Sequence, residues 1–186
     1  MLLGFDISTS VIGFSAFNLE GELVELDCVK FKDKQSIFEK LAFFEEKIKH
    51  YKSAEIKYIG IEEPLKKFSG RFSNADTISK LNFFNGMISS YLYLTFKVEP
   101  QYLNVSTARK TSFPELNMKT PEIKHEVWKK VVECEPQINW KYSKITGKLM
   151  DENYDMSDSY VISRSYLKIL NDRNDVQLKE GYFNKK

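Results

Sequence analysis

The sequence has little cysteine, glycine or proline, and it has no long apolar run. Its two cysteines, Cys28 and Cys134, stand in no Cys-x-x-Cys spacing and beside no histidine pair, so neither a zinc site nor a disulfide framework is expected. No segment approaches the roughly 18 consecutive apolar residues of a membrane helix, and the start MLLGFDISTS lacks the basic and apolar parts of a signal peptide. We therefore expect a cytoplasmic protein without a membrane partner.

The composition is that of a folded chain. Apolar residues make up 42% and charged residues 29%, far from the composition of disordered proteins. No repeat or low-complexity linker divides the 186 residues, so we expect one domain over residues 1–170 and a polar tail at residues 171–186. The net charge of +2 identifies no partner, but nine Lys or Arg face five Glu between Arg109 and Lys148. This local excess suits either an anionic partner or a solvated surface.

The first 31 residues have the pattern of three short strands. Strand-forming runs at residues 2–7, 11–18 and 22–31 are separated by turns at Ser8–Ser10 and Glu20–Gly21. Turns this short predict antiparallel pairing of the three strands.

The rest of the chain alternates between helical and strand patterns. The expected elements are a helix at 35–51, a buried strand at 56–62, a helix at 74–96, a strand at 97–103, a helix at 120–133, a small hairpin at 138–150 and a helix at 155–170. This order predicts an α/β protein with a mixed sheet.

Four acids stand where they could carry chemistry: Asp6, Glu62, Asp155 and Asp158. Each has an ordinary structural explanation, such as a turn residue, an exposed strand end or an acid that favours a helix dipole. As a set they offer hard oxygen ligands from separate elements, which Mg²⁺ or Mn²⁺ requires. Two such ions about 3.5–4 Å apart can hold a phosphodiester and activate water. The set therefore predicts phosphodiester hydrolysis.

Three blocks of sequence, in this order, resemble those of the RuvC family. The first block has an acid on the first strand, followed by a turn of small residues. The second block has a strand that ends in Glu, followed by a loop and a long helix that opens with Asn-Ala-Asp. The third block has an Asp-x-x-Asp motif on the last helix. They read LGFDISTSVIGFSAF, IGIEEPLKKFSGRFSNADTISKLNFFNG and YDMSDSYVISRS. Together the blocks span most of residues 1–170.

This resemblance implies a ribonuclease H-like fold, with a mixed five-stranded sheet and helices on both faces. It also implies a homodimeric endodeoxyribonuclease that resolves Holliday junctions and other branched DNA by paired nicks, leaving 5′-phosphate and 3′-hydroxyl ends. The four acids match the family's ligands for two Mg²⁺ ions, for which Mn²⁺ can substitute, and Asp6 would bridge both ions. Lys110 and Lys124 match basic positions near the scissile or flanking phosphates, with Lys124 in the catalytic set; both also suit surface lysines. Arg109 is expected to contact DNA with them.

Two departures point to a phage or viral resolvase, which would act in the host cytoplasm. The loop after Glu62 looks longer than in the bacterial enzymes, and the stretch from Cys134 to Tyr154 is expanded. The loop at residues 64–73 interleaves basic and aromatic residues without an acid, which suits phosphate contacts and base stacking as well as an ordinary surface loop. The expected DNA contacts in it are Lys66, Lys67, Phe68, Arg71 and Phe72.

The helix at 74–96 carries more apolar residues than one face needs, which predicts a dimer interface or a larger core. The residues left over are Phe83, Phe84, Met87, Tyr91 and Tyr93. In the expanded stretch, Trp140 and Tyr142 suit either DNA or dimer contacts or the packing of the small hairpin.

Three other readings compete with a junction resolvase. A ribonuclease H-like nuclease acting on RNA–DNA hybrids, flaps or structured RNA would use the same acids. An actin-like or sugar-kinase-like ATPase needs a second phosphate-binding hairpin and a longer chain. A non-catalytic DNA-binding scaffold is expected to have lost at least one of the acids.

Overall fold

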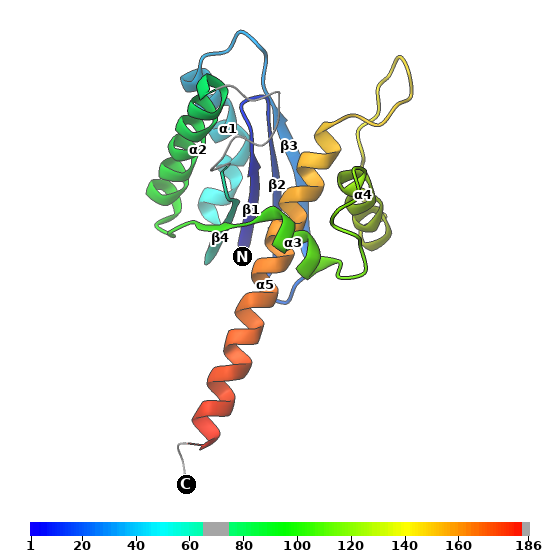
Figure 1. Cartoon of the computed structure of the whole chain (residues 1–186). Coiled ribbons are helices and arrows are strands. Elements are labelled where there is room, and N and C mark those ends of the chain that lie inside the picture. The colour runs from blue at the N-terminus through cyan, green and yellow to red at the C-terminus, as the bar shows by residue number, and fades with distance from the viewer. Residues whose placement is uncertain (65–74, 184–186) are drawn as a thin grey trace.

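A mixed five-stranded sheet forms the centre of the molecule (Figure 1). The computed structural model describes residues 1–64 and 75–183, with side chains as far as residue 173. Its strands are β1 (Leu2–Ile7), β2 (Val11–Phe17), β3 (Leu23–Lys30), β4 (Tyr58–Glu62) and β5 (Gln101–Leu103). They lie in the order β3-β2-β1-β4-β5, with antiparallel pairing among β1, β2 and β3 and parallel pairing of β1 with β4 and of β4 with β5. The mixed five-stranded sheet predicted from the sequence is confirmed.

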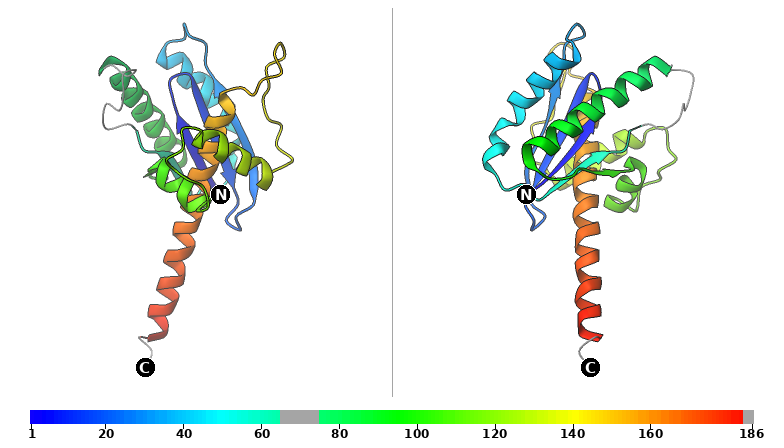
Figure 2. Two further views of the ribbon diagram at one scale, coloured as in Figure 1. Left: turned by 45° about the vertical axis from the view of Figure 1, so that its right-hand side comes forward. Right: turned by 90° about the vertical axis from the view of Figure 1, so that its left-hand side faces the viewer.

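Helices cover both faces of the sheet, as two views of the ribbon show (Figure 2). On one face lie α1 (Ile37–Ile48), which continues as the 3-10 turn η1 (Lys49–Ser53), and α2 (Ala75–Phe96). On the other face lie α3 (Val105–Ser112), α4 (Ile123–Cys134) and α5 (Glu152–Phe183). In the described part of the chain no helix is both long enough and apolar enough to cross a membrane.

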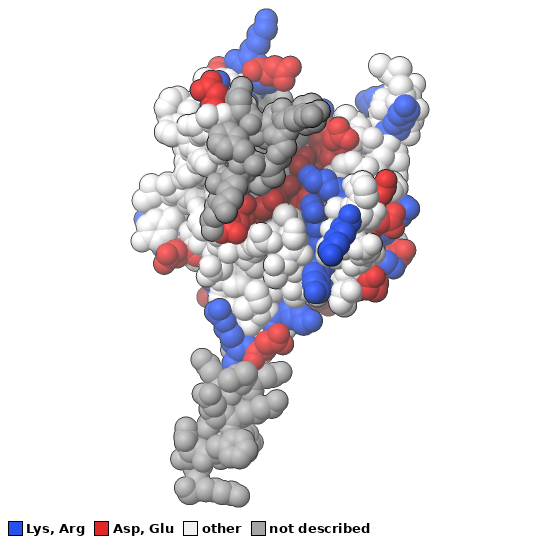
Figure 3. All heavy atoms as spheres, viewed as in Figure 1, with Lys and Arg blue, Asp and Glu red and all other residues white. Residues whose placement is uncertain are grey.

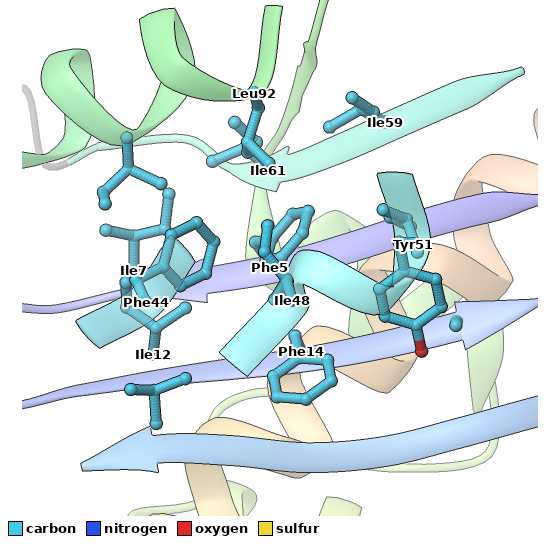
Figure 4. Close-up of a cluster of buried hydrophobic side chains, with 14 of the residues drawn as sticks. Phe5, Ile7, Ile12, Phe14, Phe44, Ile48, Tyr51, Ile59, Ile61 and Leu92 are labelled. Carbon is cyan, nitrogen blue, oxygen red and sulfur yellow. The ribbon is translucent and has the colours of Figure 1, made fainter. Parts of the chain in front are cut away.

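Two hydrophobic cores follow from the two-residue period of β1. Phe5 and Ile7 point toward α1 and α2, where they pack in one core with Phe44 and Leu92 (Figure 4). Leu2 belongs to the second core, which lies under α3, α4 and α5. By the same alternation, Asp6 lies on the α5 side of the sheet.

Two glycines let α5 approach the sheet closely. A Cβ atom at Gly13 would lie 2.1 Å from the carbonyl oxygen of Asp155, and one at Gly4 would lie 2.1 Å from the hydroxyl of Ser163. A hydrogen bond also joins the strand to the helix at this point: the hydroxyl of Ser15 on β2 donates to the carbonyl of Ser159 on α5 at 2.8 Å. Because these two positions have no side chain, the first turns of α5 can pack directly against β1 and β2.

The structure departs from the sequence-based elements in three places. The strand expected at 97–103 is confined to β5, since Pro100 and the residues before it do not join the sheet. Helix α3 was not expected from the sequence; it is a polar helix of eight residues whose N-cap, Asn104, accepts a hydrogen bond from the backbone of Thr107. Helix α5 continues to Phe183, well beyond Leu170, and no proline follows to end it.

Candidate metal centre

The parallel pairing of β1 with β4 brings two of the predicted acids together. Phe5 lies opposite Ile61 in the register, so the next residues, Asp6 and Glu62, lie side by side where the two strands end. Asp158 reaches the same point from α5. Among the described residues these three form a group whose ligand atoms all lie within 4.8 Å of one another.

Asp155 lies at the edge of this group, one turn before Asp158 on α5. It is partly buried and lines a hollow of about 340 Å³ together with Asp6, Glu62, Arg109 and Lys124. In Figure 3, acidic and basic side chains gather next to each other in this part of the surface. All four predicted acids therefore meet at one end of the sheet.

Burial and mutual repulsion raise the pKa of three of these acids. The pKa of Asp6 lies well above its ordinary value, because the side chain is buried and because Glu62 and Asp158 add negative charge. Burial also raises the pKa of Glu62, and this effect outweighs a hydrogen bond with Asp6 that lowers the pKa. Burial, followed by the charge of Asp6, raises the pKa of Asp155 to about 7. The acids thus form a cluster whose negative charge is poorly compensated.

Arg109 is the closest basic partner of the cluster. Its Nε and Nη2 atoms donate to the two carboxylate oxygens of Asp158 at 2.9 and 2.6 Å, and the two side chains are only 9% and 2% exposed. The sequence predicts a DNA contact for Arg109, but the structure places its guanidinium inside the site. The pair was not predicted from the sequence, because α3 was not expected and because Asp158 lies 49 positions further along the chain.

The two predicted lysines lie nearer the surface. Lys124, near the start of α4, is more than half exposed, and its Nζ lies 3.7 Å from an oxygen of Asp158. Lys110 is exposed on α3, next to Arg109. Lys124 can therefore reach both the acids and a bound anion.

The predicted contacts in the loop after Glu62 lie outside the described residues. They are Lys66, Lys67, Phe68, Arg71 and Phe72. The described residues just before the loop, Glu63 and Pro64, line the same hollow as the acids. The loop therefore starts at the candidate site.

The cluster suits a hard divalent cation. Its ligands are carboxylate oxygens from β1, β4 and α5, and they converge closely enough to share an ion. Neutralisation by a cation would relieve the repulsion that raises the pKa of Asp6. The described residues offer no histidine or cysteine to this group, so the ligand set favours Mg²⁺ or Mn²⁺ over softer metals.

Comparison with known proteins yields matches among solved structures only. No family model and no curated protein matches the sequence. RuvC of Thermus thermophilus in complex with Holliday junction substrate matches with a TM-score of 0.61 and 13% identity, over 88% of this chain and 90% of that one. The resolvase of fowlpox virus, in complex with substrate Holliday junction DNA, matches with a TM-score of 0.54 and 13% identity, over 91% and 97% of the two chains. The chain has the RuvC-like fold, and the predicted resemblance is confirmed at the level of the fold.

Proposed function

We propose that this protein is a divalent-metal-dependent endonuclease that cuts branched DNA, with the Holliday junction as its main substrate. One observation carries the proposal: three carboxylates from three separate elements converge within 4.8 Å at the end of the central strands of a RuvC-like fold. A fold alone does not define a function, so the converging acids are the stronger argument.

In this proposal the four acids bind the metal and the nearby basic groups orient the site. Two Mg²⁺ ions, when bound, would hold the scissile phosphodiester, activate water and stabilise the leaving oxygen. Asp6, which borders the other three acids, would be a ligand of the bound metal. Arg109 holds the carboxylate of Asp158 in one orientation, and Lys124 is placed to contact a DNA phosphate beside the acids. Each nick would leave 5′-phosphate and 3′-hydroxyl ends.

Preference for branched DNA is proposed to come from the surroundings of the acids. The loop at residues 64–73 leaves the hollow directly after Glu62, and its basic and aromatic residues suit an opened strand at a crossover. The double variant Phe68→Ala and Phe72→Ala should then lose junction cutting more than cutting of nicked duplex.

A junction resolvase needs two active sites, which a twofold homodimer would supply. The extra apolar residues predicted on α2 fall into two groups in the structure. Phe84 packs against Phe31, and Tyr91 packs against Phe44, at the core. Phe83 and Met87 line a groove of about 670 Å³ between α1 and α2, which we call the α1–α2 groove, whereas exposed Tyr93 lies outside it. Its apolar lining residues are Phe38, Leu41, Phe83, Met87, Tyr91 and Leu94. We propose this groove as the dimer interface.

A cleavage panel tests the function. The purified protein is incubated with a mobile four-way junction, a flap, a Y-fork, a linear duplex and an RNA–DNA hybrid, each with Mg²⁺ and with EDTA. We expect paired nicks in the junction with Mg²⁺ and no product with EDTA. Faster cutting of the hybrid than of any branched DNA would instead support the ribonuclease H-like alternative. Equal cutting with EDTA would contradict the metal dependence.

A further inference from the structure

A short hairpin between α4 and α5 projects from the end of the molecule that carries the acids. It comprises Lys141–Met150, here called the 141–150 hairpin. In Figure 1 it extends beyond the start of α5, at the end of the sheet where β1 and β4 terminate. The 141–150 hairpin therefore stands beside the path of any DNA that reaches the acids.

Backbone hydrogen bonds hold the hairpin in one shape. The amide of Met150 donates to the carbonyl of Lys141 at 3.1 Å, and the amide of Ser143 donates to the carbonyl of Lys148 at 2.8 Å. The amide of Gly147 closes the turn onto the carbonyl of Ser143 at 2.8 Å, and Gly147 has a φ of +67°, which glycine adopts without strain. The tip is therefore formed before any partner binds.

A buried asparagine fixes the base of the hairpin to the helix that carries Asp155. The Nδ2 of Asn153 donates to the carbonyls of Lys141 and Met150 at 2.6 and 2.8 Å, and its Oδ1 accepts from the amide of Lys141 at 2.9 Å. The Nζ of Lys141 also contacts Asp27 on β3 at 2.7 Å. Since Asn153 lies two residues before Asp155, the hairpin has a set position relative to the acids.

The surface between the hairpin and the acids is continuous. A hollow of about 420 Å³ lies at the hairpin's base, and acids as well as Lys30 line it: Ser10, Val11, Lys30, Leu149, Met150, Asp151, Glu152 and Asp155. Asp155 lines this hollow and also the hollow of the candidate metal centre. A strand lying across the acids could therefore extend to the hairpin.

The tip combines one apolar side chain with positive charge. Ile145 is 95% exposed, Lys144 and Lys148 beside it are exposed, and the ten residues of the hairpin contain no acid. Proteins that bend DNA often place an apolar side chain between base steps while basic residues hold the phosphates. The charge and shape of the tip thus fit nucleic acid.

We propose that the 141–150 hairpin binds the DNA arm next to the cut, with Lys144 and Lys148 on its phosphates and Ile145 wedged against a base step. The proposal rests on the proposed function and identifies how that site would engage a distorted duplex. It also gives the expanded 134–154 stretch a role.

The first test removes the two charges. The variant Lys144→Ala/Lys148→Ala and the parent are titrated against a fluorescent four-way junction in EDTA, by anisotropy, at several salt concentrations. We expect about 3- to 10-fold weaker binding and a salt slope smaller by about two. The control, Lys49→Ala/Lys57→Ala, removes the same charge near the start of β4 and should leave the slope unchanged. Equal slopes for the parent and the hairpin variant would overturn the phosphate contacts.

The second test addresses the wedge. Junctions carry 2-aminopurine at single positions flanking the branch point, and binding of the parent should raise its fluorescence at one or more of them. Ile145→Ser should remove most of that rise with less than a threefold change in dissociation constant, whereas Ile145→Leu should keep it. A rise that survives Ile145→Ser, or no rise with the parent, would overturn the wedge.

The outcomes separate this proposal from the proposed function. If the parent cuts the junction with Mg²⁺ while the hairpin variants match it in slope and fluorescence, only the hairpin proposal fails. If the parent cuts no branched DNA, the proposed function fails. If Ile145→Ser instead converts a dimer to a monomer in sedimentation, the tip contacts a second copy of the chain, and the DNA role is overturned.

Discussion

At the scale of the residue, Asp6 is the centre of the candidate site. It lies next to Glu62 and within ligand distance of Asp158, and its pKa responds to both. Asp155 also shares a hydrogen bond with it, so Asp6 interacts with all three other acids of the cluster. The chemistry of the site should therefore depend most on this side chain.

We expect Asp6→Asn to reduce cleavage by at least 10³-fold while junction affinity changes less than threefold. The neutral amide weakens metal binding, whereas DNA affinity comes mainly from phosphate contacts elsewhere. Single-turnover cleavage with Mg²⁺ and anisotropy with EDTA measure the two effects. Glu62→Gln, Asp155→Asn and Asp158→Asn should also reduce cleavage. An Asp6→Asn variant that cuts at the parent's rate would contradict the mechanism.

Arg109 acts on the site through Asp158. Removing one partner of a buried pair leaves a charge without compensation, so Arg109→Met should lower the free energy of unfolding by about 3 kcal/mol. Urea unfolding in EDTA measures the change. The double variant Arg109→Met/Asp158→Asn is the control, and it should regain much of the loss because both charges are gone. The single variant Asp158→Asn completes the cycle, and if the loss in the double variant equals the sum of the two single losses, the two residues are not energetically coupled.

At the scale of the element, α2 has two apolar surfaces with different roles. Phe84, Ile88 and Leu92 are buried against the sheet, whereas Phe83 and Leu94 are 59% and 62% exposed on the α1–α2 groove. An exposed apolar strip of this kind on a helix is typical of an interface. The second surface of α2 is therefore left exposed to solvent in the monomer.

Charges placed on this strip should separate the proposed dimer without unfolding the monomer. We expect Phe83→Glu/Leu94→Glu to weaken dimerisation at least tenfold, since a carboxylate would be buried without a partner. Sedimentation velocity at micromolar concentration measures the change, and circular dichroism checks the fold. Phe43→Glu is a matched control, because Phe43 is exposed on α1 but does not line the groove. A parent that is monomeric with and without junction DNA would rule out this interface.

At the scale of the whole molecule, the acid cluster links stability to pH and to metal. Asp155 has its pKa raised from 3.8 to about 7, so between these values the folded state binds more protons than the unfolded state. Stability from this residue is present at low pH and is lost as pH rises toward 7. A bound cation should restore it.

In EDTA we therefore expect Asp155→Asn to be more stable than the parent at pH 8 and about equal to it at pH 4. Because the side chain is partly buried and Lys124 lies nearby, the gain should be about 1–2 kcal/mol, or roughly 2–8 °C in melting temperature. Millimolar Mn²⁺ should raise the melting temperature of the parent more than that of the variant. Thermal melts across this pH range, with and without Mn²⁺, test both statements. A parent that melts at the same temperature with Mn²⁺ and with EDTA would argue against a metal centre.

Local patterns in the sequence predicted much of the fold. The strand-forming runs at 2–7 and 11–18 and the short turn between them predict β1, β2 and their antiparallel pairing, because strand propensity and turn length are local properties. The helical spacing in 35–51 and 74–96 likewise predicts α1 and α2. Helix α3 was not predicted, since it is only eight residues long and mostly polar, and it is held by its cap and by packing against α5.

The sequence by itself determined which acids end strands and which share a turn of a helix, and so named Asp6, Glu62, Asp155 and Asp158 as candidates. Only the tertiary structure decided how they meet. The approach of α5 over Gly4 and Gly13 brings Asp158 close to Asp6, and the fold buries Arg109 in an ion pair with Asp158 that the sequence did not indicate. These outcomes depend on contacts between residues far apart in the chain, and the volumes and charges that fix such contacts leave no periodic signal in the sequence.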